Sequence, residues 1–151
     1  MKRRMMGSVS LLAILAGAMQ IVPTALPPAG KAGFHVDAPP DVSAALERSC
    51  GDCHSGATRL PWYGRIAPAS WLVAHHVREG RSELDFSTWD RLPASWRAEI
   101  RRDICRETKG GSMPLRSYLW LHPGARLAPA EIAAICRWSS VDEEPIDAGA
   151  E

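Results

Sequence analysis

The feature that most constrains this chain is residues 49–55, in which Cys50 and Cys53 are followed at once by His54. Two thiols three positions apart lie about one helical turn from each other, so both can face one edge of a flat prosthetic group. A histidine directly after such a pair completes the attachment signature of c-type haem. Each thiol adds across one haem vinyl group, and the imidazole becomes the proximal iron ligand. The segment therefore predicts one covalent haem c held by these three residues.

Two other interpretations of the same cysteines stay open at this point. A thioredoxin-type redox pair requires a βαβ context, which the flanking sequence does not show. A zinc site is the second alternative, with Cys105 and Cys136 completing four thiolates. Those two cysteines stand far apart rather than as a second close pair, which weakens the zinc interpretation.

The first 25 residues are typical of an export segment. Three cations at residues 2–4 precede an almost uninterrupted apolar run over residues 5–22. Cleavage after Ala18 or Ala25 would release a soluble periplasmic protein, whereas an uncleaved run would serve as a membrane anchor through residues 5–22. Both alternatives predict an extracytoplasmic location, where disulfides persist.

Composition and charge indicate a single folded unit without affinity for nucleic acid. The chain has 151 residues, enough for one domain. Residues 1–25 hold three of the 18 cations and none of the 17 acids, so the rest carries a net charge of −2. We expect a Pro-, Gly- and Ala-rich linker at 26–40, a haem-binding domain at 41–139 and an acidic, disordered tail at 140–151.

Helical periodicity dominates the expected domain, and no alternating strand pattern appears. Asp41 is a suitable N-cap for a helix that runs into the attachment segment. One face of that helix is predicted to be buried, and it consists of Val42, Ala45, Leu46 and Ser49. The prediction is an all-α fold.

Three further helices are expected. The first spans 68–79 and ends at Gly80, and the second spans 93–107 before a stop at 109–111. The second has an apolar stripe made of Trp96, Ile100 and Ile104. The last spans 129–138.

The sixth iron ligand is predicted to be Met113. All other methionines lie in the export segment, and Met113 follows a Gly-Gly helix stop in a loop before Pro114. A thioether ligand there would raise the reduction potential, because soft sulfur favours ferrous iron. His76 is the main alternative, and His75, His122 or an open position also remain.

An ordered set of motifs resembles the bacterial haem-binding domain family of cytochrome c-like proteins. The matching positions in the first half are residues 50–55, 61–63, 66–68, 70–71, 76–77, 79–81, 86–87 and 89. In the second half they are residues 113–114, 118, 122–123, 125, 127, 131, 135 and 138. The resemblance covers roughly 41–139 and implies a small cytochrome c-like helical domain around one covalent haem.

Cys105 and Cys136 are not part of that family pattern. In an oxidising compartment they are expected to form a disulfide, which would contribute roughly 3 kcal/mol, although two buried free thiols are the alternative. Candidates for pairing with the haem propionates are Arg65, Arg78 and Arg81, if they are not ordinary surface arginines. Candidates for walls of the haem pocket, or for general core packing, are Trp62, Trp71, Trp89 and Trp120.

The function expected from these features is electron transfer by an exported mono-haem cytochrome, with redox proteins as donor and acceptor and no enzymatic activity. Two alternatives are a peroxidase-type accessory subunit and a haem sensor whose sixth ligand exchanges. The sequence offers no assignable acid–base arrangement at a distal site, which ranks the enzyme lower.

Overall fold

The computed structural model describes residues 2–22, 26 and 33–140, and every regular element within these residues is a helix. The α-helices are α1 (Lys2–Ile21), α2 (Pro40–His54), α3 (Ala69–Glu83), α4 (Ala94–Gly110), α5 (Arg116–Leu121) and α6 (Pro129–Ser139). The 3-10 helices are η1 (Trp62–Arg65), η2 (Phe86–Arg91) and η3 (Pro123–Ala125). The predicted all-α class is confirmed. Residues 27–32 of the expected linker and the acidic tail beyond Ser140 lie outside the described residues.

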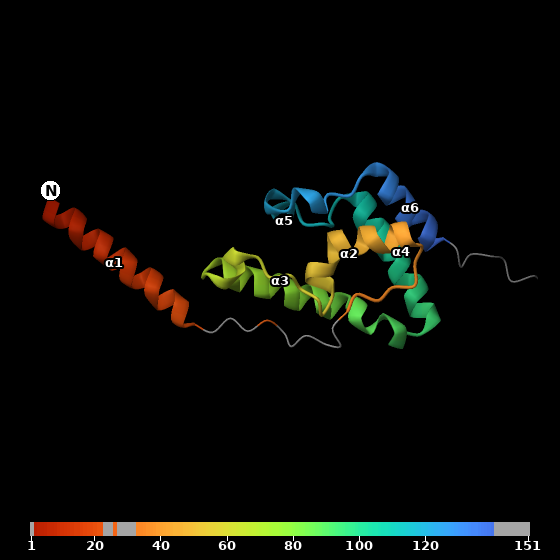
Figure 1. Cartoon of the computed structure of the whole chain (residues 1–151), viewed down its shortest axis with the longest axis horizontal. Coiled ribbons are helices and arrows are strands. Elements are labelled where there is room, and N and C mark those ends of the chain that lie inside the picture. Colours follow the sequence, from red (N-terminus) through yellow and green to blue (C-terminus); the bar gives the residue numbers. More distant parts are fainter. Residues whose placement is uncertain (1, 23–25, 27–32, 141–151) are drawn as a thin grey trace, which may run out of the picture.

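The core lies where α2, η2, α4 and α6 meet (Figure 1). All four residues predicted for the inner face of α2 are buried, because their spacing places them on one side of the helix. The opposing elements contribute Phe86, Trp89, Ile104, Leu127, Ile135 and Trp138. Three of these rings form a tilted series, with centroids 6.1 Å apart for Phe86 and Trp89 and 6.0 Å for Trp89 and Trp138. This packing fixes the N-terminal half of α2 and so supports the attachment segment at its other end.

Two predicted helix features are wrong. The helix expected to end at Gly80 continues to Glu83, so Gly80 lies inside α3. Trp96, expected in the apolar stripe of α4, is 60% exposed, whereas Ile100 and Ile104 of the same stripe pack in the core. The stop after α4 is as expected, with Gly111 in the left-handed conformation at φ 73°.

The tryptophans divide between core and surface. Trp89 is fully buried, whereas Trp62 and Trp120 are 76% and 81% exposed. Trp71 is partly buried on α3. Trp62 and Trp120 are therefore not part of the core.

Helix α1 extends away from the other helices (Figure 1). Its last turn contacts the segment before α3: the Gln20 amide donates to the Ala67 carbonyl oxygen (3.2 Å) and accepts from the Ala67 N–H (3.0 Å). Among residues 2–22, 26 and 33–140, no helix is both long and apolar enough to cross a membrane.

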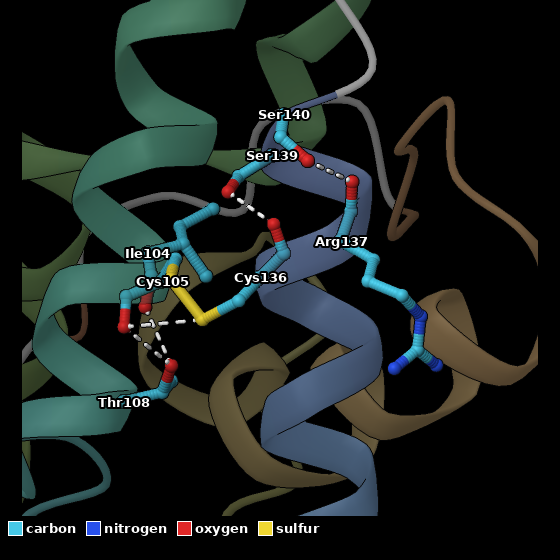
Figure 2. The surroundings of a disulfide bond; sticks show 7 residues. All are labelled: Ile104, Cys105, Thr108, Cys136, Arg137, Ser139 and Ser140. Carbon is cyan, nitrogen blue, oxygen red and sulfur yellow. Dashed lines mark hydrogen bonds between the residues drawn. A yellow bond between two sulfur atoms is a disulfide. The ribbon is translucent and has the colours of Figure 1, made fainter.

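A disulfide joins Cys105 of α4 to Cys136 of α6, with an S–S distance of 2.01 Å (Figure 2). The two helices lie side by side at this point, and α4 continues past it with Thr108 donating to the Ile104 carbonyl oxygen at 2.7 Å. The bond closes a loop that contains Met113, α5 and η3. It therefore restricts the segment that carries several of the candidate site residues.

Removal of the disulfide is expected to destabilise the fold without changing its helical content. We expect the double variant Cys105→Ala/Cys136→Ala to lose about 3 kcal/mol of unfolding free energy, because the unfolded chain regains the entropy of the open loop. Denaturant unfolding followed by circular dichroism measures this. Equal stability of the variant and of the oxidised wild type would contradict the expectation, whereas reductant should lower the stability of the wild type alone.

Candidate functional site

The predicted attachment residues occupy the C-terminal end of α2. Cys50, Cys53 and His54 lie in its last turn or two, and Ser55 ends the helix in an extended conformation (φ −146°, ψ 167°). Both cysteines are free thiols. The helix therefore presents the thiols one turn apart, as the spacing predicts.

His54 is held by a hydrogen bond that selects its tautomer. Its Nδ1 donates to the carbonyl oxygen of Leu84 at 3.1 Å, and a carbonyl can only accept. The proton therefore resides on Nδ1, and Nε2 keeps its lone pair. Burial lowers the pKa of His54, and the hydrogen bond to Leu84 offsets part of this effect. A neutral imidazole whose far nitrogen bonds a backbone carbonyl is the form in which histidine binds metals.

The environment of the cysteines disfavours both alternative interpretations. Burial raises the pKa of Cys50 to about 12 and that of Cys53 to about 11, whereas thioredoxin-type pairs depend on lowered values. The thiols required for a four-thiolate zinc site, Cys105 and Cys136, are joined to each other instead.

Gly80 brings α3 into backbone contact with the attachment segment. A Cβ at this position would lie 2.8 Å from the Cys53 carbonyl oxygen and 3.2 Å from the Cys53 carbon and Cβ. Real Cβ atoms do not approach backbone so closely, so a side chain here would push α3 away from α2. The sequence pattern identified the glycine but assigned it to a helix end. A glycine inside a helical pattern can also indicate that another backbone approaches closely, and this is the sequence signal that could have predicted the contact.

The loop after His54 is held by α3 as well. The Arg81 Nε donates to the Ser55 carbonyl oxygen (2.8 Å), and its guanidinium also donates to Thr58 Oγ1 (2.9 Å). Thr58 Oγ1 in turn donates to the Asp52 carbonyl oxygen at 2.8 Å. Of the three arginines considered for the propionates, Arg81 thus holds the loop that follows the attachment motif. Arg65 and Arg78 are exposed.

A largely apolar cavity adjoins Cys53, with an empty volume of about 660 Å³ that includes space open to solvent. Its walls come from the end of α2, η1, α3 and α5, and they include Cys53, Leu72, His76, Leu115 and Leu121. Sites for small ligands have such apolar walls. Of the three predicted attachment residues, Cys53 lines this cavity, whereas Cys50 and His54 do not. The two free thiols and the neutral imidazole are nevertheless chemical groups that can hold a haem.

A chain of polar groups crosses the wall of this cavity. The Tyr118 hydroxyl donates to Asp52 Oδ2 (2.8 Å), while His122 Nδ1 donates to the Tyr118 carbonyl oxygen (3.1 Å). The remaining His122 nitrogen, Nε2, accepts from the Tyr63 hydroxyl at 3.4 Å, and the Tyr118 and His122 rings stack at 4.1 Å. Burial and the bond to Asp52 raise the pKa of Tyr118. These residues come from η1, α2, α5 and the position directly after α5, and no sequence pattern connects them.

The candidate sixth ligands are placed differently. His76 lines the cavity, as does His122, whereas His75 points to the exposed side and pairs with Glu79 (3.2 Å). Met113 is partly buried in the loop after α4, where its N–H donates to the Glu107 carbonyl oxygen (3.3 Å). The cavity wall contains Leu115 from that loop and not Met113. The structure thus gathers Cys53, His76 and His122 around one space.

Comparison with known proteins identifies the family. The sequence model of the haem-binding domain matches residues 13–141, which is most of the chain, so the protein belongs to the haem-binding domain family. It is therefore a haem-binding protein. Searches of curated proteins and of solved structures found no match.

The Gly80 contact can be tested by adding one methyl group. Gly80→Ala is expected to lower the unfolding free energy by about 1–3 kcal/mol, because the methyl meets the Cys53 backbone. Gly110→Ala is the matched control: it is also a helical glycine, but nothing lies within 4 Å of its Cβ position. Alanine there should be neutral or stabilising. Equal effects of both substitutions in denaturant unfolding would show that the close contact does not matter.

Proposed function

We propose that this protein is an exported c-type cytochrome with one haem bound covalently through Cys50 and Cys53 and with His54 as the proximal ligand. The observation that carries the proposal is the hydrogen bond that His54 Nδ1 donates. It leaves Nε2 unprotonated and able to bind iron, in the same helix end as two free thiols. In the attachment, each thiol gives its sulfur to one carbon of a vinyl group and its hydrogen to the other. When bound, the haem iron supplies a one-electron ferric–ferrous couple.

The residues around the motif have three tasks in this proposal. Leu84 and Gly80 hold the imidazole and the helix end in place, so the ligand does not reorient when the iron changes charge. The apolar walls beside Cys53 would exclude water from a haem ring bound there. The side chains of Leu72 and Leu121, which are exposed at the cavity, offer an apolar contact surface to a redox protein that donates or accepts the electron.

An extracytoplasmic location is part of the proposal. The cationic and apolar residues of the export segment support it, and so does the disulfide between Cys105 and Cys136, because such bonds persist in oxidising compartments. Cleavage of that segment and its retention as a tether remain alternatives.

Met113 is proposed as the sixth ligand, since it is the methionine of the folded part and lies in the loop that leads to the cavity residue Leu115. A second candidate function, a haem protein with an exchangeable or open sixth position, is favoured by one observation: polar groups of Tyr63 and His122 lie at the cavity and Met113 does not line it. Such a protein would bind small ligands at the iron.

Covalent attachment is tested by mass spectrometry of protein co-expressed with a c-type maturation system. The denatured wild type should carry the mass of one haem, and Cys50→Ala/Cys53→Ala should carry none. The control Cys105→Ala/Cys136→Ala should keep its haem, because those sulfurs lie in another part of the fold. Haem that separates from the wild type in acidic acetone would refute the covalent linkage.

The sixth ligand is tested by optical spectra of three alanine variants. If Met113 binds iron, the ferric wild type shows the sulfur-to-iron charge-transfer band, Met113→Ala loses it, and the reduction potential falls. His76→Ala and His122→Ala should keep the band. A wild type without the band that binds carbon monoxide readily would favour the exchangeable site, and loss of the low-spin spectrum in His76→Ala would assign the position to that histidine.

A further inference from the structure

Exposed apolar side chains gather on one face of the helical domain. Between residues 33 and 140, six large hydrophobic side chains are exposed, and five of them lie in or beside η1, α3 and α5. The exception is Trp96 of α4. Single exposed hydrophobic residues are ordinary, whereas a contiguous group marks a contact surface. We call the five residues the apolar face, and they are Trp62, Ile66, Leu72, Trp120 and Leu121.

The apolar cavity described above shows that these residues belong to one surface. Leu72 and Leu121 line it from α3 and α5. Trp62 packs edge-on against the wall residue Tyr63, with ring centroids 5.8 Å apart. The Tyr63 hydroxyl in turn reaches His122 Nε2 at 3.4 Å, directly after α5. The other two members of the apolar face follow η1 directly and precede Leu121 in α5.

Helix α1 ends at this face. The Gln20 side chain forms two hydrogen bonds with the backbone of Ala67, which is the residue after Ile66 (3.2 and 3.0 Å). Figure 1 shows α1 and α5 on one side of the domain and α6 on the other. The apolar residues of α1 and the apolar face are therefore presented together.

Helix α1 is apolar on all sides. Leu11, Leu12 and Ile14 are exposed, and they point in different directions because successive residues are rotated by about 100°. A globular partner covers one side of such a helix, whereas lipid surrounds it. The helix therefore favours lipid over protein as the occupant of the surface at its end.

The stretches of sequence that carry the apolar face contain no acid. None of the 17 acids of the chain lies within residues 53–78 or 108–130. The next acid along α3 is Glu79, about two turns beyond Leu72, and it pairs with His75 at 3.2 Å. No carboxylate therefore interrupts the face itself.

Positive charge borders the face. Arg65 ends η1 and Arg116 begins α5, and both are exposed. Within the described residues neither of them forms an ion pair. The acid of the adjoining cavity wall, Asp52, pairs with Arg59 at 3.6 Å. The two remaining cations make the border of the face positive, which suits an anionic surface.

We propose that the apolar face binds the surface of an anionic lipid bilayer, with its two tryptophans at the level of the headgroups. Tryptophan suits this position because an apolar ring carries one polar N–H, and the guanidinium groups of Arg65 and Arg116 match lipid phosphates. Such binding increases with apolar area and with attraction between cations and anionic lipid. The lipid contact does not depend on haem. Where the proposed function also holds, the cavity mouth faces the membrane, so the redox protein that meets it is itself embedded there.

The test measures the oxidation of individual tryptophans by hydroxyl radicals, followed by mass spectrometry of peptides from the full-length holoprotein. The vesicles contain equal parts of phosphatidylglycerol and phosphatidylcholine, and vesicles of phosphatidylcholine alone are the uncharged comparison. The mixed vesicles should protect Trp62 and Trp120 severalfold relative to Trp96, which is exposed outside the face. Because α1 contains no tryptophan, its own insertion does not contribute to this measurement.

The double variant Arg65→Gln/Arg116→Gln tests the role of charge. Each lost arginine should raise the lipid concentration required for half-maximal protection about fivefold. The matched control is Arg91→Gln/Arg102→Gln, which removes two exposed arginines from η2 and α4 and should behave as the wild type. All four side chains are exposed, so these substitutions leave the fold intact.

Four results would overturn the proposal. If the chain binds vesicles but Trp62 and Trp120 stay as reactive as they are without lipid, α1 alone holds the membrane. If neutral vesicles protect them equally, or if the variant Arg65→Gln/Arg116→Gln matches the wild type, the face does not select anionic lipid. If protection appears without lipid and rises with protein concentration, the occupant is a second copy of the chain. If the chain does not bind vesicles at all, the face is left to a protein partner. The mass of covalent haem is measured separately, so failure here leaves the proposed function intact.

Discussion

The hydrogen bond from His54 Nδ1 to the Leu84 carbonyl oxygen is the interaction on which the candidate site depends. It joins the last residue of α2 to the segment after α3, and it determines which imidazole nitrogen remains free. Gly80 and Arg81 reinforce the same junction from α3 through a backbone contact and through hydrogen bonds to the following loop. The motif is thus supported on a rigid helix end rather than on a loop, which keeps a metal ligand in a fixed orientation.

Much of the fold follows from sequence periodicity. The features that periodicity does not predict depend on contacts between different helices. The buried face of α2 is predictable because residues such as Val42 and Leu46 recur at helical spacing and the core covers that face. The end of α3 is not predictable in this way. The local sequence indicates that Gly80 ends the helix. The structure instead requires glycine here because the backbone of Cys53, in another helix, leaves no room for a side chain. Trp96 shows the same limit, since it continues the helical spacing of Ile100 and Ile104 but lies outside the core that buries them.

The attachment motif of the candidate site is predictable from the sequence, whereas the cavity wall is not. Cys50, Cys53 and His54 form a local motif whose chemistry depends on spacing alone. The cavity wall depends instead on how η1, α3 and α5 meet, so no local pattern connects Tyr63 with His122. Met113 stands out by elimination among the methionines, but its relation to the cavity depends on the course of the loop after α4.

The contact between Gly80 and Cys53 also limits how this architecture can diverge. Where α2 and α3 keep their present separation, position 80 admits only a hydrogen atom. A related chain with a larger residue there must displace α3, and α3 carries Leu72, His76 and Val77 of the cavity wall. The width of the cavity is thereby coupled to a single position outside it, and a change at residue 80 would act on ligand access and helix spacing together.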